Sequence, residues 1–157
     1  VLTAPPGTDG RVRIAKIWSS HDEYLGQAAD TEADGFGVMR TYMLSAETTP
    51  SVQSSFAGEL EAGKYGPTGV YTFPNRSEFA GEWTSGHPSF GLREFAGHDP
   101  KLKCDFYLGQ LEATLNHSRP LWRPHGDGIA VDAIRRRVYC GSINGGSFSE
   151  VAETFDF

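Results

Sequence analysis

Residues 78–86 read EFAGEWTSG, and this short stretch decides the fold. In an extended strand Phe79, Gly81 and Trp83 lie on one face, because successive side chains alternate between the two faces. A glycine two residues from an aromatic residue leaves a gap into which a neighbouring ring can lie flat. Gly86 falls where the strand has to turn, and hairpin turns often need the positive φ that glycine adopts without strain. The stretch therefore predicts a β-hairpin strand with its turn.

The pattern aromatic, any residue, glycine, any residue, apolar residue occurs five times along the chain. The five copies start at Tyr24, Phe56, Phe79, Tyr107 and Tyr139. The intervals of 32, 23, 28 and 32 residues fit a 23-residue unit with insertions. One hairpin cannot bury its aromatic face alone, so successive units have to stack. The sequence therefore predicts an array of hairpins.

Composition agrees with this reading and excludes several classes of protein. The chain has 157 residues, the length of about one domain, and its 19 glycines disfavour a helical bundle because glycine weakens helices. A net charge of −6 disfavours nucleic-acid binding, and no nucleic-acid partner is expected. No stretch reaches the roughly 18 apolar residues needed to span a bilayer. Cys104 and Cys140 lack a CxxC spacing, which leaves either a disulfide or, as we favour, two buried thiols.

The repeat resembles the MORN (membrane occupation and recognition nexus) family, whose unit is written Y-x-G-x-W-x-x-G-x-x-x-G-x-G. Residues 78–86 fit it with Phe79 in place of the first Tyr, and residues 69–75 resemble its G-x-Y-x-F-P-(N/D) ending. Residues 123–128 resemble the H-G-x-G hinge. The chain departs from the family pattern at Ala28, where the family prefers Trp, before Gly91, where one residue is missing, and at residues 116–122, which are extra.

The resemblance implies an all-β fold: an elongated, twisted antiparallel sheet of about five successive β-hairpin repeats with short N- and C-terminal capping segments. We expect an N-terminal extension at residues 1–21, the MORN-repeat array at 22–148 and a C-terminal tail at 149–157. Residues 150–155 have some helical character and are expected to cap the last hairpin.

The sequence predicts no catalytic, cofactor-binding or metal site. The five histidines lack an HExxH or similar ligand spacing, and no G-x-S-x-G elbow or phosphate-binding loop is present. His125, which precedes Gly126-Asp127-Gly128, reads as a hinge residue rather than part of an anion-binding turn. We therefore expect no enzyme activity and no cofactor.

Two sets of residues are candidate contact surfaces. The expected protein interface is aromatic and consists of Phe79, Trp83, Tyr107 and Trp122. The expected contact for anionic lipid or an acidic partner is the one dense basic cluster, Arg135, Arg136 and Arg137. The alternative interpretation of the arginines is a solvated strand end that protects a sheet edge.

The resulting hypothesis is a non-catalytic structural or accessory subunit, a scaffold that mediates protein-protein contacts in a larger assembly. The assembly is expected to be an organelle or mitochondrial membrane complex, or a ciliary structure. A chain that starts at Val1 marginally favours a processed mitochondrial protein, with the cilium as the alternative location inside the cell. A peripheral phospholipid-binding module is the second hypothesis, and a small all-β enzyme or isomerase is the third.

Overall fold

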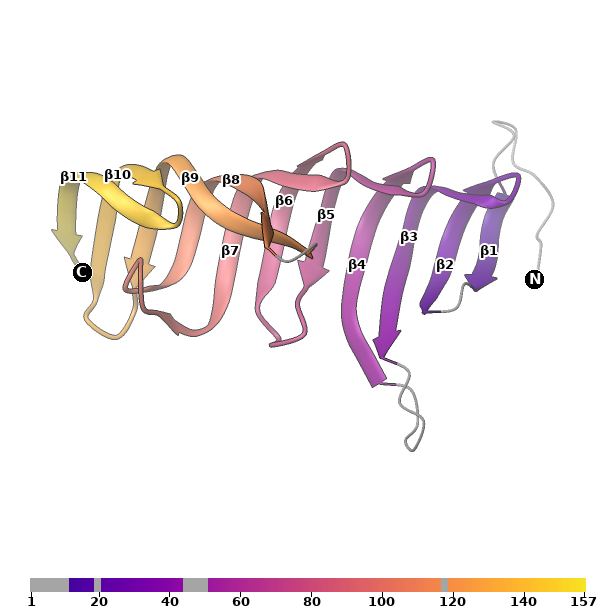
Figure 1. Ribbon diagram of the computed structural model, residues 1–157, viewed down its shortest axis with the longest axis horizontal. Coiled ribbons are helices and arrows are strands. Elements are labelled where there is room, and N and C mark those ends of the chain that lie inside the picture. Colours follow the sequence, from indigo (N-terminus) through magenta and orange to yellow (C-terminus); the bar gives the residue numbers. More distant parts are fainter. Residues whose placement is uncertain (1–11, 19–20, 44–50, 117–118) are drawn as a thin grey trace. The chain divides into compact units, whose positions relative to one another are not determined.

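The computed structural model describes the chain at residues 12–18, 21–43, 51–116 and 119–157, and its side chains at 21–42, 51–113 and 122–157. These residues form eleven strands and no helix (Figure 1). The strands are β1 Val12–Trp18, β2 Asp22–Ala29, β3 Glu32–Met43, β4 Ser51–Glu61, β5 Lys64–Thr72, β6 Glu78–Thr84, β7 His87–Asp99, β8 Cys104–Asn116, β9 Arg119–Asp132, β10 Arg137–Asn144 and β11 Ser147–Asp156.

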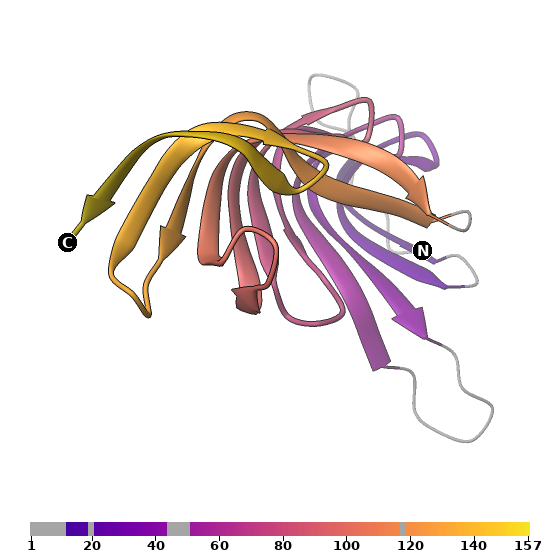
Figure 2. The same cartoon turned by 60° about the vertical axis from the view of Figure 1, so that its left-hand side comes forward.

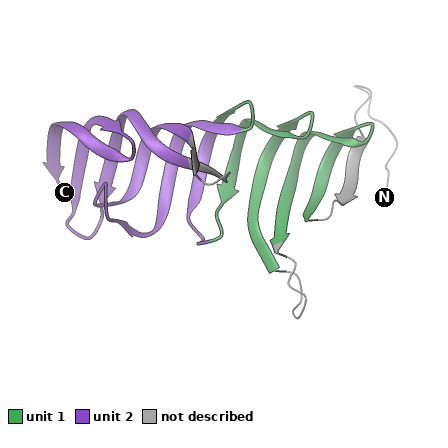
Figure 3. Cartoon of the chain, in the orientation of Figure 1, with its two compact units in different colours: residues 1–74, 83–86 green, residues 75–82, 87–157 purple. Residues whose placement is uncertain are grey.

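The strands pair in chain order in one open antiparallel sheet, which confirms the predicted all-β hairpin array. The chain divides into two compact units (Figure 3): residues 1–74 with 83–86, and residues 75–82 with 87–157. We call them unit 1 and unit 2 and describe each by itself. Within unit 2, β7 to β11 lie side by side in both views of the chain (Figures 1 and 2).

The five repeat aromatics lie on the even-numbered strands β2 to β10, and each following strand returns as the second half of a hairpin. Three hairpins have two-residue turns in which both residues have a positive φ, as in a type I′ turn. These turns are Ala62-Gly63, Ser85-Gly86 and Gly145-Gly146. The predicted turn at Gly86 is confirmed, and Gly63 and Gly146, which also follow a repeat aromatic by seven residues, form the corresponding turns.

In unit 1, glycines face one another across neighbouring strands and leave room for the repeat aromatics. The facing pairs are Gly26 with Gly37, Gly37 with Gly58, and Gly58 with Gly69. A methyl group at Gly37 would meet the Tyr24 ring, and one at Gly69 would meet the Phe56 ring, at less than van der Waals distance. Each ring therefore occupies the space that a side chain would need.

Unit 2 repeats this arrangement. The facing glycine pairs are Gly91 with Gly109, Gly109 with Gly128, and Gly128 with Gly141. The Tyr107 ring covers Gly109 and Gly128, and the Phe79 ring covers Gly81 and Gly91. Both rings lie in gaps left by glycines, as predicted, and each comes from the same repeat, two residues before the first glycine that it covers.

The tyrosines of the first and fourth repeats also use their hydroxyl groups. The hydroxyl of Tyr24 donates to the carbonyl of Gln27 at 2.5 Å, and that of Tyr107 to the carbonyl of Gln110 at 3.0 Å. In both hairpins the pairing register shifts beside that glutamine, so the tyrosine bonds a carbonyl at the irregular step of the ladder. Burial, together with the charge of Asp34, raises the pKa of Tyr24 to about 12.

The two ends of the chain differ from the sequence prediction. Residues 147–156 form strand β11 along β10, so the helical character expected at 150–155 is wrong. Backbone pairing with a neighbouring strand overrides the weak local preference, and Val151, Thr154 and Phe155 suit an extended chain. Val12–Trp18, inside the predicted N-terminal extension, pairs with β2 as a further strand. Residues 1–11 of that extension lie outside the described residues.

Both cysteines are free thiols, with Cys104 buried and Cys140 half-buried. Burial, with the charges of Asp99, Asp105 and Asp132, raises the pKa of the Cys104 thiol to about 12. Because the thiolate is the reacting form, Cys104 is protected both sterically and electrostatically. We expect a thiol reagent at neutral pH to modify one cysteine per native chain and both in denaturant. Equal rates for the two thiols in the native protein would contradict this.

Candidate functional site

The repeat aromatics, such as Tyr24, Phe56, Phe79 and Tyr107, lie on one face of their units, and we call the opposite face the outer face. In unit 1 four apolar side chains lie next to one another across the strands of this face: Leu25, Val38, Ala57 and Val70. Leu25 is 46% exposed and Val70 is 38% exposed. Each of these residues is next in sequence to one of the facing glycines. Because side chains alternate between the two faces of a strand, they point away from the repeat aromatics.

Unit 2 carries the corresponding row on its own outer face. Leu92 faces Leu108, Leu108 faces Ile129, and Ile129 faces Cys140 across four consecutive strands. We call these four residues the apolar row. Leu92, Leu108 and Ile129 remain between 39% and 45% exposed. A contiguous set of exposed apolar side chains indicates a contact surface more strongly than isolated ones do.

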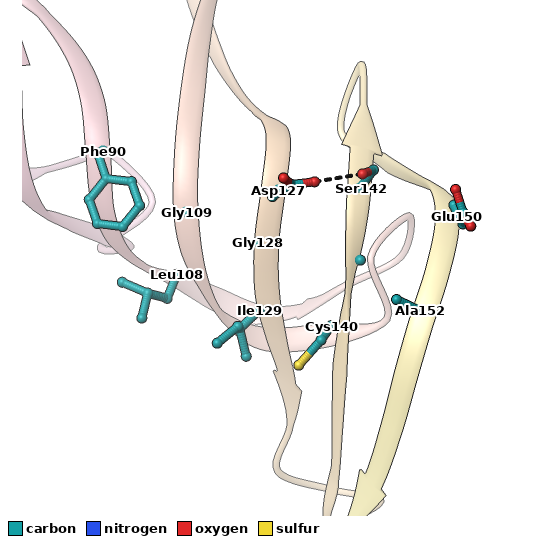
Figure 4. Close-up of a pocket in the computed structure, with 11 residues that line it drawn as sticks. Phe90, Leu108, Gly109, Asp127, Gly128, Ile129, Cys140, Ser142, Glu150 and Ala152 are labelled. Carbon is teal, nitrogen blue, oxygen red and sulfur yellow. Dashed lines mark hydrogen bonds between the residues drawn. The ribbon is translucent and has the colours of Figure 1, made fainter.

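An open groove of about 540 Å³ lies along the apolar row, with lining residues on β7 to β11 that include Phe90 (Figure 4). Its floor is the backbone of three facing glycines, Gly109, Gly128 and Gly141. A Cβ atom at these positions would point to the other face of the sheet. One side is lined by Leu108, Ile129 and Cys140, and the other by Asp127, Ser142 and Glu150. The groove therefore has an apolar side and an acidic side.

The polar side of the groove consists of two carboxylates and one hydroxyl group. The hydroxyl of Ser142 donates to the Asp127 carboxylate at 2.6 Å (Figure 4). A serine nucleophile needs a base within hydrogen-bond reach, usually an imidazole, and no histidine lines this groove in the part of the chain that the structure describes. Two exposed carboxylates beside an apolar side match a partner that brings apolar and cationic side chains.

The aromatic interface predicted from the sequence needs correction. Phe79 and Tyr107 are 0% exposed and Trp83 is 4% exposed, so these rings form the core of their units. The indole N–H of Trp83 donates to the carbonyl of Gly69 at 3.3 Å within unit 1. Trp122 is half-buried on β9 and does not line the groove. The facing glycines explain the burial, because they let each repeat ring fold onto its own strand pair.

The repeat pattern also contains a signal for the apolar outer face. The residue between the aromatic and the glycine is apolar in all five repeats and points away from the ring. These residues are Leu25, Ala57, Ala80, Leu108 and Cys140. Strand alternation alone places these five residues on the outer face. In a sheet with one core face and one solvated face, polar residues are expected at such positions.

The three clustered arginines lie at the turn between β9 and β10. The Arg135 guanidinium contacts the Asp132 carboxylate at 2.8 Å, and Arg137 contacts Asp156 at 2.7 Å. Arg136 lies 6.0 Å from the centre of the Phe157 ring. Two of the three charges are thus paired within unit 2. This arrangement fits the strand-end interpretation, and contact with anionic lipid stays a prediction.

Asp132 is the buried member of this turn, with a side chain that is 0% exposed. Burial acts to raise the pKa of its carboxyl, but hydrogen bonds from the backbone N–H and the guanidinium of Arg135 outweigh it and hold the pKa below its usual value. The carboxylate therefore stays charged at neutral pH and fixes the turn.

No protein-family model matches the sequence, and no curated protein matches it. Among the described residues there is no helix that is long and apolar enough to cross a membrane.

Proposed function

We propose that this chain is a non-catalytic structural or accessory subunit, a hairpin-repeat scaffold that holds other proteins within a larger assembly. The observation that carries the proposal is the outer face, where apolar side chains form contiguous rows and stay substantially exposed. Apolar surface that stays in contact with water costs about 25 cal/mol per Å² relative to the same surface buried. A protein partner that covers the row removes this cost.

The groove in unit 2 suggests the chemistry of that partner. The backbone groups of β8 to β10 are paired within the sheet, so the groove floor has few main-chain groups to offer a ligand. Recognition then depends on the side chains of the apolar row and on Asp127 and Glu150. We infer that the partner contributes a segment with apolar residues and at least one lysine or arginine.

The test replaces Ile129 with lysine in the full-length protein and compares partner capture from native extract with that of the unchanged chain. Ile129 is 39% exposed, so the variant is expected to fold, and it adds a charge to the centre of the apolar row. We expect capture of groove-dependent partners to fall at least about tenfold, the effect of losing roughly 1.4 kcal/mol.

The matched control is Ile134→Lys, the same change at a 75% exposed residue in the turn between β9 and β10, outside the groove. This variant is expected to retain the partners. Partners that bind all three proteins equally, or an unchanged chain that stays a free monomer in its native extract, would contradict the proposal.

The assembly itself is proposed on the sequence alone. The MORN resemblance supports a scaffold role and suggests a ciliary structure, and a mitochondrial membrane complex is the other location proposed. Identification of the captured partners by mass spectrometry tests both locations in the same experiment.

A further inference from the structure

We propose that His98, Asp105 and Asp132 form a binding site for a divalent transition-metal cation in unit 2. The three residues come from β7, β8 and the end of β9. One ligand atom from each lies within 4.8 Å of the others. One imidazole and two carboxylates supply the nitrogen and oxygen donors that Zn²⁺ and Mn²⁺ accept in proteins.

Both carboxylates are already oriented by backbone groups. The N–H of Arg135 donates to Oδ1 of Asp132 at 2.7 Å, and the N–H of Ala133 donates to Oδ2 of Asp105 at 2.8 Å. The second oxygen of each carboxylate faces the cluster: Oδ1 of Asp105 lies 3.6 Å from Nδ1 of His98, and Oδ2 of Asp132 is paired with the Arg135 guanidinium. Hydrogen bonds to the non-ligating atoms are the usual way in which proteins hold metal ligands in place.

A cationic group of the protein already lies among these donors. Nη1 of Arg135 is 2.8 Å from Oδ2 of Asp132 and 3.4 Å from Nε2 of His98. The Arg135 side chain is 57% exposed, so it can move into solvent when a metal ion replaces it. The position therefore attracts positive charge, and Arg135 is the competitor of the metal.

A further observation favours a cation of higher charge. Nδ1 of His98 is shielded from solvent and has no hydrogen-bond partner within the described residues, so this potential donor atom is unsatisfied. The single charge of Arg135 does not neutralise the two carboxylates of the cluster, Asp105 and Asp132.

No local sequence motif contains these ligands, because His98, Asp105 and Asp132 lie on three different strands. We expected no metal from the histidine spacing. Only the pairing of β7, β8 and β9 brings the three side chains together, and such long-range placement is not visible in a local pattern.

The test titrates ZnCl₂ into the EDTA-treated full-length chain and follows binding by calorimetry. We expect one Zn²⁺ per chain, with a dissociation constant that rises at least about tenfold in His98→Ala and in Asp105→Asn. The asparagine keeps an oxygen acceptor for the N–H of Ala133. Arg135→Met removes the competitor and is expected to tighten binding about fivefold or more, a change that a merely structural cluster would not produce.

The matched control is His125→Ala, because His125 also faces a carboxylate in unit 2, Glu112 at 3.5 Å. This variant is expected to bind Zn²⁺ as the unchanged chain does. Absence of Zn²⁺ binding by the unchanged chain, or binding that survives both His98→Ala and Asp105→Asn, would overturn the proposal. Binding that is lost in Cys140→Ser but not in His98→Ala would place the metal at the thiol and overturn it as well.

Discussion

Gly128→Ala is expected to destabilise unit 2 by about 3 kcal/mol or more, because its methyl group has no space. The new Cβ would lie 2.4 Å from the Tyr107 ring, well inside contact distance. The ring cannot swing away, since it is 0% exposed and its hydroxyl is bonded to the carbonyl of Gln110. Urea denaturation followed by tryptophan fluorescence measures the change in the free energy of unfolding.

Gly145→Ala is the matched control for this prediction. A methyl group at Gly145 meets nothing within 4 Å, but its φ of +58° disfavours a side chain. We expect a loss of only about 1 kcal/mol there. Combining Gly128→Ala with Tyr107→Leu removes the clash, so the second alanine should cost less in that background. Equal losses for Gly128→Ala in both backgrounds would show that the ring does not require the glycine.

The local features of the fold were predictable from the sequence because they depend on neighbours in the chain. The aromatic at each repeat start lies on its expected strand, and Gly63, Gly86 and Gly146 form the turns that the spacing predicted. Strand alternation and the need for positive φ both act over a few residues. The hairpin array could therefore be predicted before any tertiary contact was known.

The surface was harder to predict, since it depends on which face each unit covers. The sequence predicts Phe79 and Tyr107 as interface residues, because an isolated hairpin leaves such rings exposed. In the structure the facing glycines leave room for both rings, which are buried. The apolar row joins Leu108, Ile129 and Cys140 from three strands, and its continuity depends on their register. Register across strands is a long-range property that the repeat spacing did not specify.

The exposed apolar side chains of the outer face change how the apolar content of this chain is interpreted. Apolar residues on both faces of a strand are typical of sheets that are covered on both sides. Here the facing glycines and the rings complete one face within each unit, while the second face stays exposed at residues such as Leu25 and Leu92. The proposed contact with another protein depends on this exposed second face.

Phe56→Ala is expected to destabilise unit 1 by about 3–5 kcal/mol, as for other large-to-small changes of a buried aromatic residue. Phe56 is 0% exposed, and its ring centre lies 4.3 Å from that of Tyr65 and 5.1 Å from that of Trp83. The truncation removes both ring contacts and uncovers the backbone at Gly58 and Gly69. These glycines have no side chain that could fill the resulting cavity. Thermal and urea denaturation both measure the loss.

Two companion variants separate the ring from its surroundings. Phe56→Tyr keeps the ring and reproduces the residue found at the same position of the first and fourth repeats, so its stability is expected to stay within about 1 kcal/mol of the unchanged chain. Val70→Ala shortens a 38% exposed side chain on the outer face of the same unit and is expected to cost less than about 1 kcal/mol. If Phe56→Ala cost no more than Val70→Ala, the ring would not be the core of unit 1, and the glycines beside it would need another explanation.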